Sequence, residues 1–208
     1  MGQTVGRMPD TWDSLLEEKD RVLYWSREVL SRVTDNVNQE ESFQMDYNNE
    51  KIDKKVDLWI ETSRARVDKV RSKHRNVPEE CKIRVTREIE QIKEELKTKM
   101  RNDYQRAYAN INKLTNKIDK LGIQQRKIHG KIHELESICD ADVKRFQKKF
   151  GPLRVKTFKN LELGKRFLFE DKRLRLKFDK KVYDIDHKYL VKCAKRINKL
   201  IKNIENLK

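Results

Sequence analysis

The feature that most constrains the fold is a long seam of apolar residues in the middle of the chain. From Met100 to Cys139 the apolar positions step alternately by four and three residues, and Gln125 is the one polar member of the seam. This is the heptad repeat of a coiled coil, kept over roughly five repeats. It predicts a mainly all-α protein, an elongated coiled coil or helical bundle with one long central helix. The seam must pair with another helix, whether of the same chain, of a second copy in an oligomer or of another helical protein. The pairing residues are expected to be Ile111, Leu114, Ile118, Leu121, Ile128, Ile132 and Leu135.

The central helix is expected over residues 78–150, and two glycines within that range could interrupt it. Gly122 and Gly130 lie off the seam, and each weakens a helix by about 1 kcal/mol relative to alanine. A hairpin tip near residue 122 is the alternative. The apolar phase is kept across both glycines, so the pattern favours one continuous helix, a rod of roughly 110 Å if unbroken.

Sparse helix breakers divide the rest of the chain. Pro9, Pro78 and the pair Gly151-Pro152 are the main breaks, because proline and glycine end regular elements most often. The expected segments are a flexible N-terminus at 1–9, two amphipathic helices at 10–77, the long coiled-coil helix at 78–150, a small basic aromatic-rich head at 151–181 and a basic C-terminal helix at 182–208.

Local signals refine two of these segments. Asp10 or Thr11 is the expected N-cap of the first helix, and the polar stretch 34–42 is interpreted as the loop after it. Near the other end, apolar residues alternate across 165–178, which permits a short β-hairpin. Helical spacing links Phe167 to later apolar residues in the same stretch, so strand and helix both stay open there.

Positive charge gathers at the C-terminal end. The chain has a formal net charge of +16, and residues 151–208 hold 18 Lys and Arg against 7 Asp and Glu, a net charge of +11. Such asymmetry favours an acidic partner surface, whether an acidic protein, an anionic lipid or a nucleic acid. The cations expected to bind it are Lys172, Arg173, Arg175, Lys177, Lys180, Lys181, Lys192, Lys195, Arg196 and Lys199.

Side chains that could support catalysis or metal binding are few. His129 and His133 are four residues apart and share a helical face, but the metalloprotease glutamate does not follow the first histidine, and two solvated histidines are the expected reading. No phosphate-binding loop or nucleophile motif is present, so we expect no enzyme activity, no metal and no cofactor. Three dispersed cysteines and the lack of an apolar run of about 20 residues predict a reducing intracellular compartment, the cytoplasm, the cytoskeleton or the nucleus.

These patterns lead to three functional hypotheses. The first is a non-enzymatic coiled-coil scaffold or adaptor whose basic C-terminal region docks on an acidic surface, cytoskeletal, protein or lipid, with no small-molecule substrate. The second is a nucleic-acid-binding helical protein, although no zinc-finger, basic-zipper or RNA-binding motif is found. The third is a membrane-associated helical module that resembles BAR-type modules in outline only, with no motif that carries the resemblance.

Overall fold

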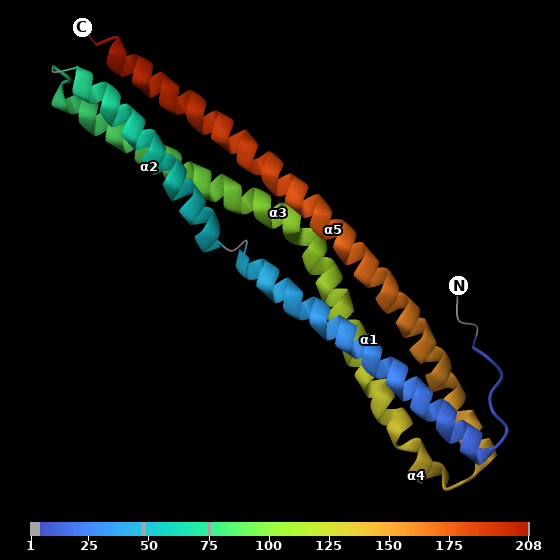
Figure 1. Cartoon of the computed structure of the whole chain (residues 1–208). Helices are drawn as coiled ribbons and strands as arrows, with labels where there is room; N and C mark the ends of the chain where they lie inside the picture. The colour runs from blue at the N-terminus through green and yellow to red at the C-terminus, as the bar shows by residue number, and fades with distance from the viewer. Residues whose placement is uncertain (1–4, 47–48, 75, 208) are drawn as a thin grey trace. The chain divides into compact units, whose positions relative to one another are not determined.

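The structure, a computed structural model, is mainly helical in the parts of the chain that it describes, residues 5–46, 49–74 and 76–207. The helices are α1 (Trp12–Asp46), α2 (Asn49–Lys73), α3 (Glu79–His133), the short α4 (Leu135–Cys139) and α5 (Val143–Glu205) (Figure 1). No strand occurs within these ranges. The all-α prediction is therefore confirmed, and the β-hairpin considered for residues 165–178 is wrong, because α5 continues through them.

The helices fall into two compact units. Unit 1 comprises Met1–Ser42 with Asn110–Arg175, and unit 2 comprises Phe43–Ala109 with Leu176–Lys208. Helices α3 and α5 contribute one part to each unit, so both units are built from segments that are distant in the sequence.

The core of unit 1 uses the predicted seam. Every seam residue from Ile111 to Leu135 is buried. The seam packs against the first half of α1 and the first half of α5, including Leu15, Val22 and Phe146. The partner of the seam in this unit is therefore the chain itself. One cluster joins Leu15, Val22, Leu23, Ile128, Ile132, Leu135, Cys139, Phe146 and Phe150, and a second joins Val29, Val33, Leu114, Ile118 and Leu161.

The one polar seam residue is fully satisfied. Gln125 is completely buried; its amide nitrogen donates to the Thr157 hydroxyl at 3.2 Å, and its oxygen accepts from the Asn160 amide at 2.8 Å. Thr157 in turn donates to the carbonyl of Leu153. A buried polar group is tolerated only when it is hydrogen-bonded, and such a network fixes the register of the helices that share it.

The long central helix ends earlier than expected. Helix α3 runs unbroken through Gly122 and Gly130, which confirms the prediction of a continuous helix across both glycines. It ends at His133, however, and not at residue 150 as expected. After α4 the chain reverses at residues 140–142, where Asp140 and Ala141 have positive φ angles of 45° and 61°. Asp142 then caps α5, since its carboxylate accepts from the backbone N–H of Arg145 at 3.0 Å.

Three expected boundaries are corrected by α1 and α5. The stretch 34–42 is helical and belongs to α1, because asparagine and serine lower helix propensity without the steric block that proline imposes. Pro152 lies inside α5, so neither the break at Gly151-Pro152 nor a separate C-terminal helix from residue 182 is present. Burial of Phe146 and Phe150 before Pro152, and of Phe158 after it, offsets the cost of the lost backbone hydrogen bond.

The start of the chain is partly packed. Thr11 caps α1 as predicted, because its hydroxyl accepts from the backbone N–H of Ser14. Met8 packs against the first core cluster of unit 1, and the Gln147 side chain donates to the carbonyl of Pro9 at 2.7 Å. The expectation of a flexible N-terminus therefore fails for Met8 and Pro9, and residues 1–4 lie outside the described part of the chain.

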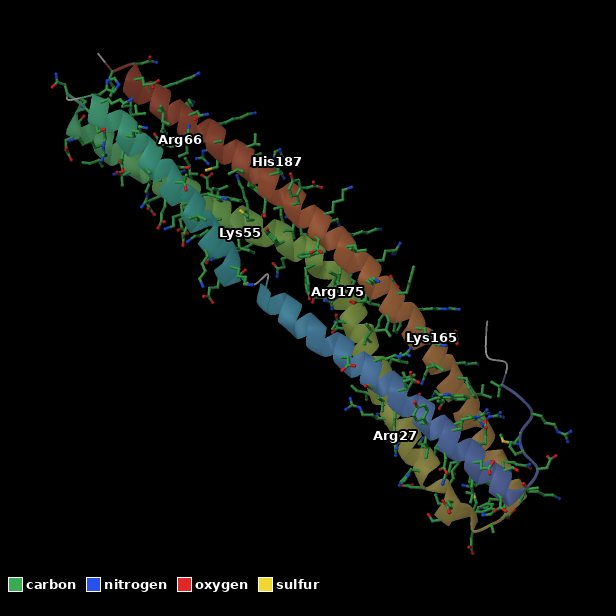
Figure 2. The ribbon with its side chains drawn as sticks, in the orientation of Figure 1. Arg27, Lys55, Arg66, Lys165, Arg175 and His187 are labelled. Atoms are coloured by element: carbon green, nitrogen blue, oxygen red, sulfur yellow. The ribbon has the colours of Figure 1, made fainter. Side chains whose placement is uncertain are left out.

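Unit 2 is held together by polar bridges as well as by its buried face. Lys55 of α2 donates to Asp186 of α5 at 2.9 Å, and Tyr104 of α3 donates to the same carboxylate. Farther along α2, Arg66, which Figure 2 labels together with Lys55, donates to Asn198 of α5 at 2.8 Å. Because these pairs advance together along both helices, α2 and this part of α5 run parallel. Asp53 and Arg64 of α2 pair with Arg101 and Glu90 of α3, so α3 runs antiparallel to α2.

Candidate docking groove of unit 2

The predicted basic face is mostly exposed, as its pattern indicated. Nine of its ten cations are exposed, and Arg175 is the exception. Arg175 donates to Asp171 at 2.8 Å, and the side chains are only 18% and 6% exposed. Arg175 therefore stabilises a buried carboxylate, and the expectation that it faces water is wrong.

The remaining basic residues differ in their pairing. Arg196 binds Glu95 of α3 at 2.6 Å. Within the part of the chain that the structure describes, no ion pair involves the cations Lys172, Arg173, Lys177, Lys180, Lys181, Lys192, Lys195 and Lys199. The Lys192 ammonium lies over the Tyr189 ring, 5.7 Å from its centroid, and no carboxylate among the described residues neutralises any of these eight charges, so they remain available to attract an acidic partner.

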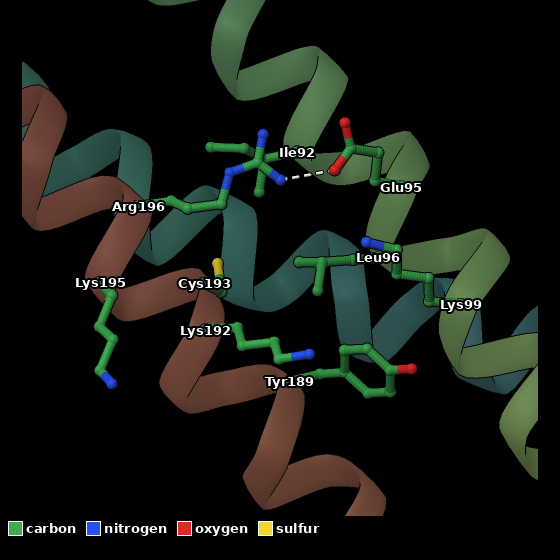
Figure 3. Close-up of a pocket in the computed structure, with 9 residues that line it drawn as sticks. All are labelled: Ile92, Glu95, Leu96, Lys99, Tyr189, Lys192, Cys193, Lys195 and Arg196. Atoms are coloured by element: carbon green, nitrogen blue, oxygen red, sulfur yellow. Dashed lines mark hydrogen bonds and ion pairs between the residues drawn. The ribbon is translucent and has the colours of Figure 1, made fainter.

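Three of the predicted cations line a cavity of about 290 Å³ in unit 2. The cavity lies between α3 and α5, and Figure 3 shows side chains of both helices, among them Leu96, Tyr189 and Arg196, facing the space between them, whereas Lys195 points away from it. Its walls are apolar and its rim is charged, with four cations and one carboxylate. The lining residues are Ile92, Glu95, Leu96, Lys99, Tyr189, Lys192, Cys193, Lys195 and Arg196.

A second cavity, also of about 290 Å³, lies between the same two helices. It is lined by Asp103, Arg106 and Ala107 of α3 and by Lys181, Asp184 and Ile185 of α5. On α3 the lining positions of both cavities follow one another at three- and four-residue steps, and so do those on α5. Residues at such steps share a helical face, so the two separate cavities lie one after the other along the same contact between α3 and α5, and we call the surface that holds both of them the α3–α5 groove.

A tyrosine bridge separates the two cavities. The Tyr189 hydroxyl donates to the Asp103 carboxylate at 2.6 Å, and the Lys188 ammonium lies 3.6 Å from the same oxygen. Burial, and then the hydrogen bond to Asp103, raise the pKa of Tyr189 to about 12. The phenol therefore stays protonated and keeps donating at every pH at which the groove would bind a partner.

The charge of the groove is uneven along its length. At the first cavity Lys99, Lys192 and Lys195 form no ion pair among the described residues, whereas Arg196 is paired with Glu95. The hydrogen bond from Arg196 holds the pKa of Glu95 below its ordinary value, so this pair stays ionised. At the second cavity two cations face two carboxylates. The positive excess is thus concentrated at the Lys192 end.

The sequence pattern identified only one wall of this groove. Lys192, Lys195 and Arg196 were recognised from the basic run on the last helix, but Lys99, Glu95 and Arg106 lie about ninety residues earlier on α3. Their helix carries a dense mixture of both charges, and no local signal distinguishes them from neighbours that face water elsewhere.

The histidine pair lies in unit 1 and is not part of the groove. The Nδ1 atom of His129 lies 2.8 Å from the Ser26 hydroxyl, and the rings of His129 and His133 stack with centroids 6.4 Å apart. Burial, then the charges of Arg27 and His133, lower the pKa of His129. Among the described residues no group of three or more His, Cys, Asp or Glu side chains is arranged to hold a metal ion.

Comparison with protein families, with curated proteins and with solved structures finds no match for this chain. Among the described residues, none of the helices combines the length and the apolar character needed to cross a bilayer.

Proposed function

We propose that this chain is a non-enzymatic adaptor that docks on an acidic protein through the basic surface of α5 in unit 2. The observation that carries the proposal is the unpaired positive charge of Lys181, Lys192, Lys195 and Lys199, all exposed on one helix. Helix α5 is anchored by its buried face to α2 and α3, so these cations are presented by a fixed scaffold. Because the backbone of α5 is already ordered, binding a partner costs side-chain entropy at these lysines but little backbone entropy.

A compartment inside the cell is part of the proposal. The three cysteines are buried and none of them forms a disulfide, which agrees with a reducing environment. An acidic protein surface met there could be cytoskeletal, and steering by complementary charge would speed the encounter.

The proposal is tested with poly-L-glutamate as a defined acidic polypeptide. Reversing Lys181, Lys192, Lys195 and Lys199 to Glu should weaken binding about tenfold or more, because each exposed contact contributes up to about 1 kcal/mol. The matched control reverses four exposed lysines on α3 in unit 1, which gives the same total charge. These are Lys113, Lys117, Lys120 and Lys127.

The control decides the outcome. Weakened binding in the α5 variant with near-normal binding in the α3 variant supports docking through α5. Equal losses in the two variants would mean that only the total charge matters, and undiminished binding in the α5 variant would remove α5 from the docking surface.

Nucleic-acid binding is the second candidate, and one observation favours it. Phe169 and Tyr183 are 75% and 72% exposed on α5, and the Tyr183 ring stacks on His187 with centroids 6.4 Å apart. Exposed aromatic rings among cations can stack on unpaired bases. Single-stranded DNA binding that is lost in Tyr183→Ala, with poly-L-glutamate binding unchanged, would favour this function over the adaptor.

A further inference from the structure

The spacing of the two cavities in the α3–α5 groove matches the length of three turns of a docked α-helix. The lining residues of the two cavities are centred about ten residues apart on α3 and on α5, which is about 15 Å along a helix at 1.5 Å per residue. Three turns of an α-helix cover about 11 residues and 16 Å. A docked helix would therefore bring the residues at positions i and i+11 over the two cavities.

The chemistry of the cavities defines the side chains that would fill them. The first has Ile92, Leu96 and Cys193 in its walls, and the second has Ala107 and Ile185. Each cavity can take an apolar side chain, and grooves between helices bind amphipathic helices in this way. The three lysines at the first cavity favour carboxylates beside the anchor that enters it.

Other occupants fit the groove less well. A second copy of this chain would bring its own excess of lysine to the groove, and like charges repel. A membrane surface contacts the convex parts of a protein, whereas the cavities of this site are concave.

We infer that the α3–α5 groove binds an acidic amphipathic helix, with apolar anchors at i and i+11 and with carboxylates clustered around the anchor that lies nearest Lys192. This inference rests on the proposed adaptor function and names the element of the acidic partner that docks. The same lysines then have two roles, since they attract the partner and they fix which end of the helix lies at which cavity.

A designed peptide provides the test. The probe is a fluorescently labelled, end-capped helix of about 18 residues, long enough to be helical when bound. It has leucine at positions i, i+4, i+7 and i+11, and glutamates around one terminal leucine. Two versions place the acidic end at the N-terminus or at the C-terminus. One control peptide replaces glutamate with lysine, and another replaces the two terminal leucines with serine.

We expect one acidic version to bind the full chain about tenfold more tightly than either control peptide in fluorescence anisotropy. Two variants locate the site independently. Lys99→Glu with Lys192→Glu should weaken binding by reversing the rim, and Ala107→Trp should weaken it by filling the second cavity. The matched control, Lys113→Glu with Lys117→Glu, should bind like the wild type, and circular dichroism verifies that each variant is folded.

Several results would overturn the inference. If the serine peptide binds as tightly as the leucine peptide, charge alone is recognised, and the groove inference fails while the adaptor proposal stands. If Ala107→Trp folds and binds normally, the cavities are not used. Self-association of the wild-type chain that Ala107→Trp abolishes would assign the groove to a second copy. No binding of the peptide or of poly-L-glutamate would remove both proposals.

Discussion

Among the residues that the structure describes, Ala141 has the backbone conformation least suited to its side chain. Its φ of 61° lies in the left-handed region, in the turn between α4 and α5. A Cβ atom in this conformation costs about 1 kcal/mol, and glycine adopts it freely. Ala141→Gly should therefore raise the free energy of unfolding by up to about 1 kcal/mol. The measurement is urea denaturation followed by circular dichroism.

The control for this substitution is Ala141→Val. A β-branched residue is more strained at positive φ than alanine, so this variant should be less stable than the wild type. If both variants lose stability, the turn does not have the left-handed conformation.

The pair formed by Glu18 and Arg154 is the most buried ion pair described in unit 1. Their side chains are 7% and 4% exposed, and the Arg154 Nε atom donates to Glu18 at 2.7 Å. Arg21 binds the other oxygen of the same carboxylate. A partnered buried charge is tolerated, whereas an isolated one is strongly destabilising.

Removing one partner should therefore be worse than removing both. Glu18→Leu leaves Arg154 buried without a carboxylate and should lower stability by about 3–5 kcal/mol. Adding Arg154→Met should restore much of that loss. A double-mutant cycle measured by chemical denaturation gives the coupling, and additive losses would show that the pair is solvated in solution.

At the scale of helices, the apolar seam was predictable and its end was not. Buried apolar residues keep their three- and four-residue spacing from Ile132 through Leu135 to Cys139, and Phe146 follows at seven residues. The chain nevertheless reverses direction between Cys139 and Phe146. An uninterrupted apolar phase cannot distinguish a continuing helix from a tight reversal. The sequence Asp140 to Asp142 contains no glycine or proline, so the turn carries no strong local signal.

The α5 side of the groove could be predicted from the sequence, but its α3 side could not. Pattern analysis assigns charged residues to the outside, which held for nine of the ten cations predicted to form the basic face of α5 but not for Arg175, nor for Arg154 earlier in the same helix. It cannot predict that Asp171, Glu18 and Lys19 are buried, because their partners come from another turn or another helix. Which α3 charges face α5 is equally a tertiary property, and Lys99 has no local feature that marks it.

The seam itself gives a prediction at this scale. Ile111 and Leu114 are 1% and 4% exposed, and their replacement by Asp would bury two carboxylates without partners. We expect unit 1 to lose its fold, since each unpaired buried charge is very costly. The loss should appear as a large fall in helicity by circular dichroism.

The control places the same charges on the outside of the same helix. Lys113→Asp with Lys117→Asp changes two exposed positions, and such changes usually stay within about 0.5 kcal/mol each. A helical, stable Ile111→Asp, Leu114→Asp variant would mean that α3 presents a different face to α1 and α5.

For the whole molecule, the net charge of +16 gives salt two opposite effects. Self-repulsion among like charges destabilises the folded chain, and ions screen it over about 10 Å at 0.1 M. Adding NaCl up to about 0.3 M should therefore raise the midpoint of thermal unfolding.

The same salt should weaken binding to poly-L-glutamate, because that attraction depends on the exposed lysines of α5. Both are measured on one sample series, by circular dichroism and by anisotropy of labelled polymer. Binding that strengthens with salt would indicate an apolar contact in place of the charged one. A midpoint of thermal unfolding that falls with salt would mean that the ion pairs inside the two units outweigh the repulsion among their lysines and arginines.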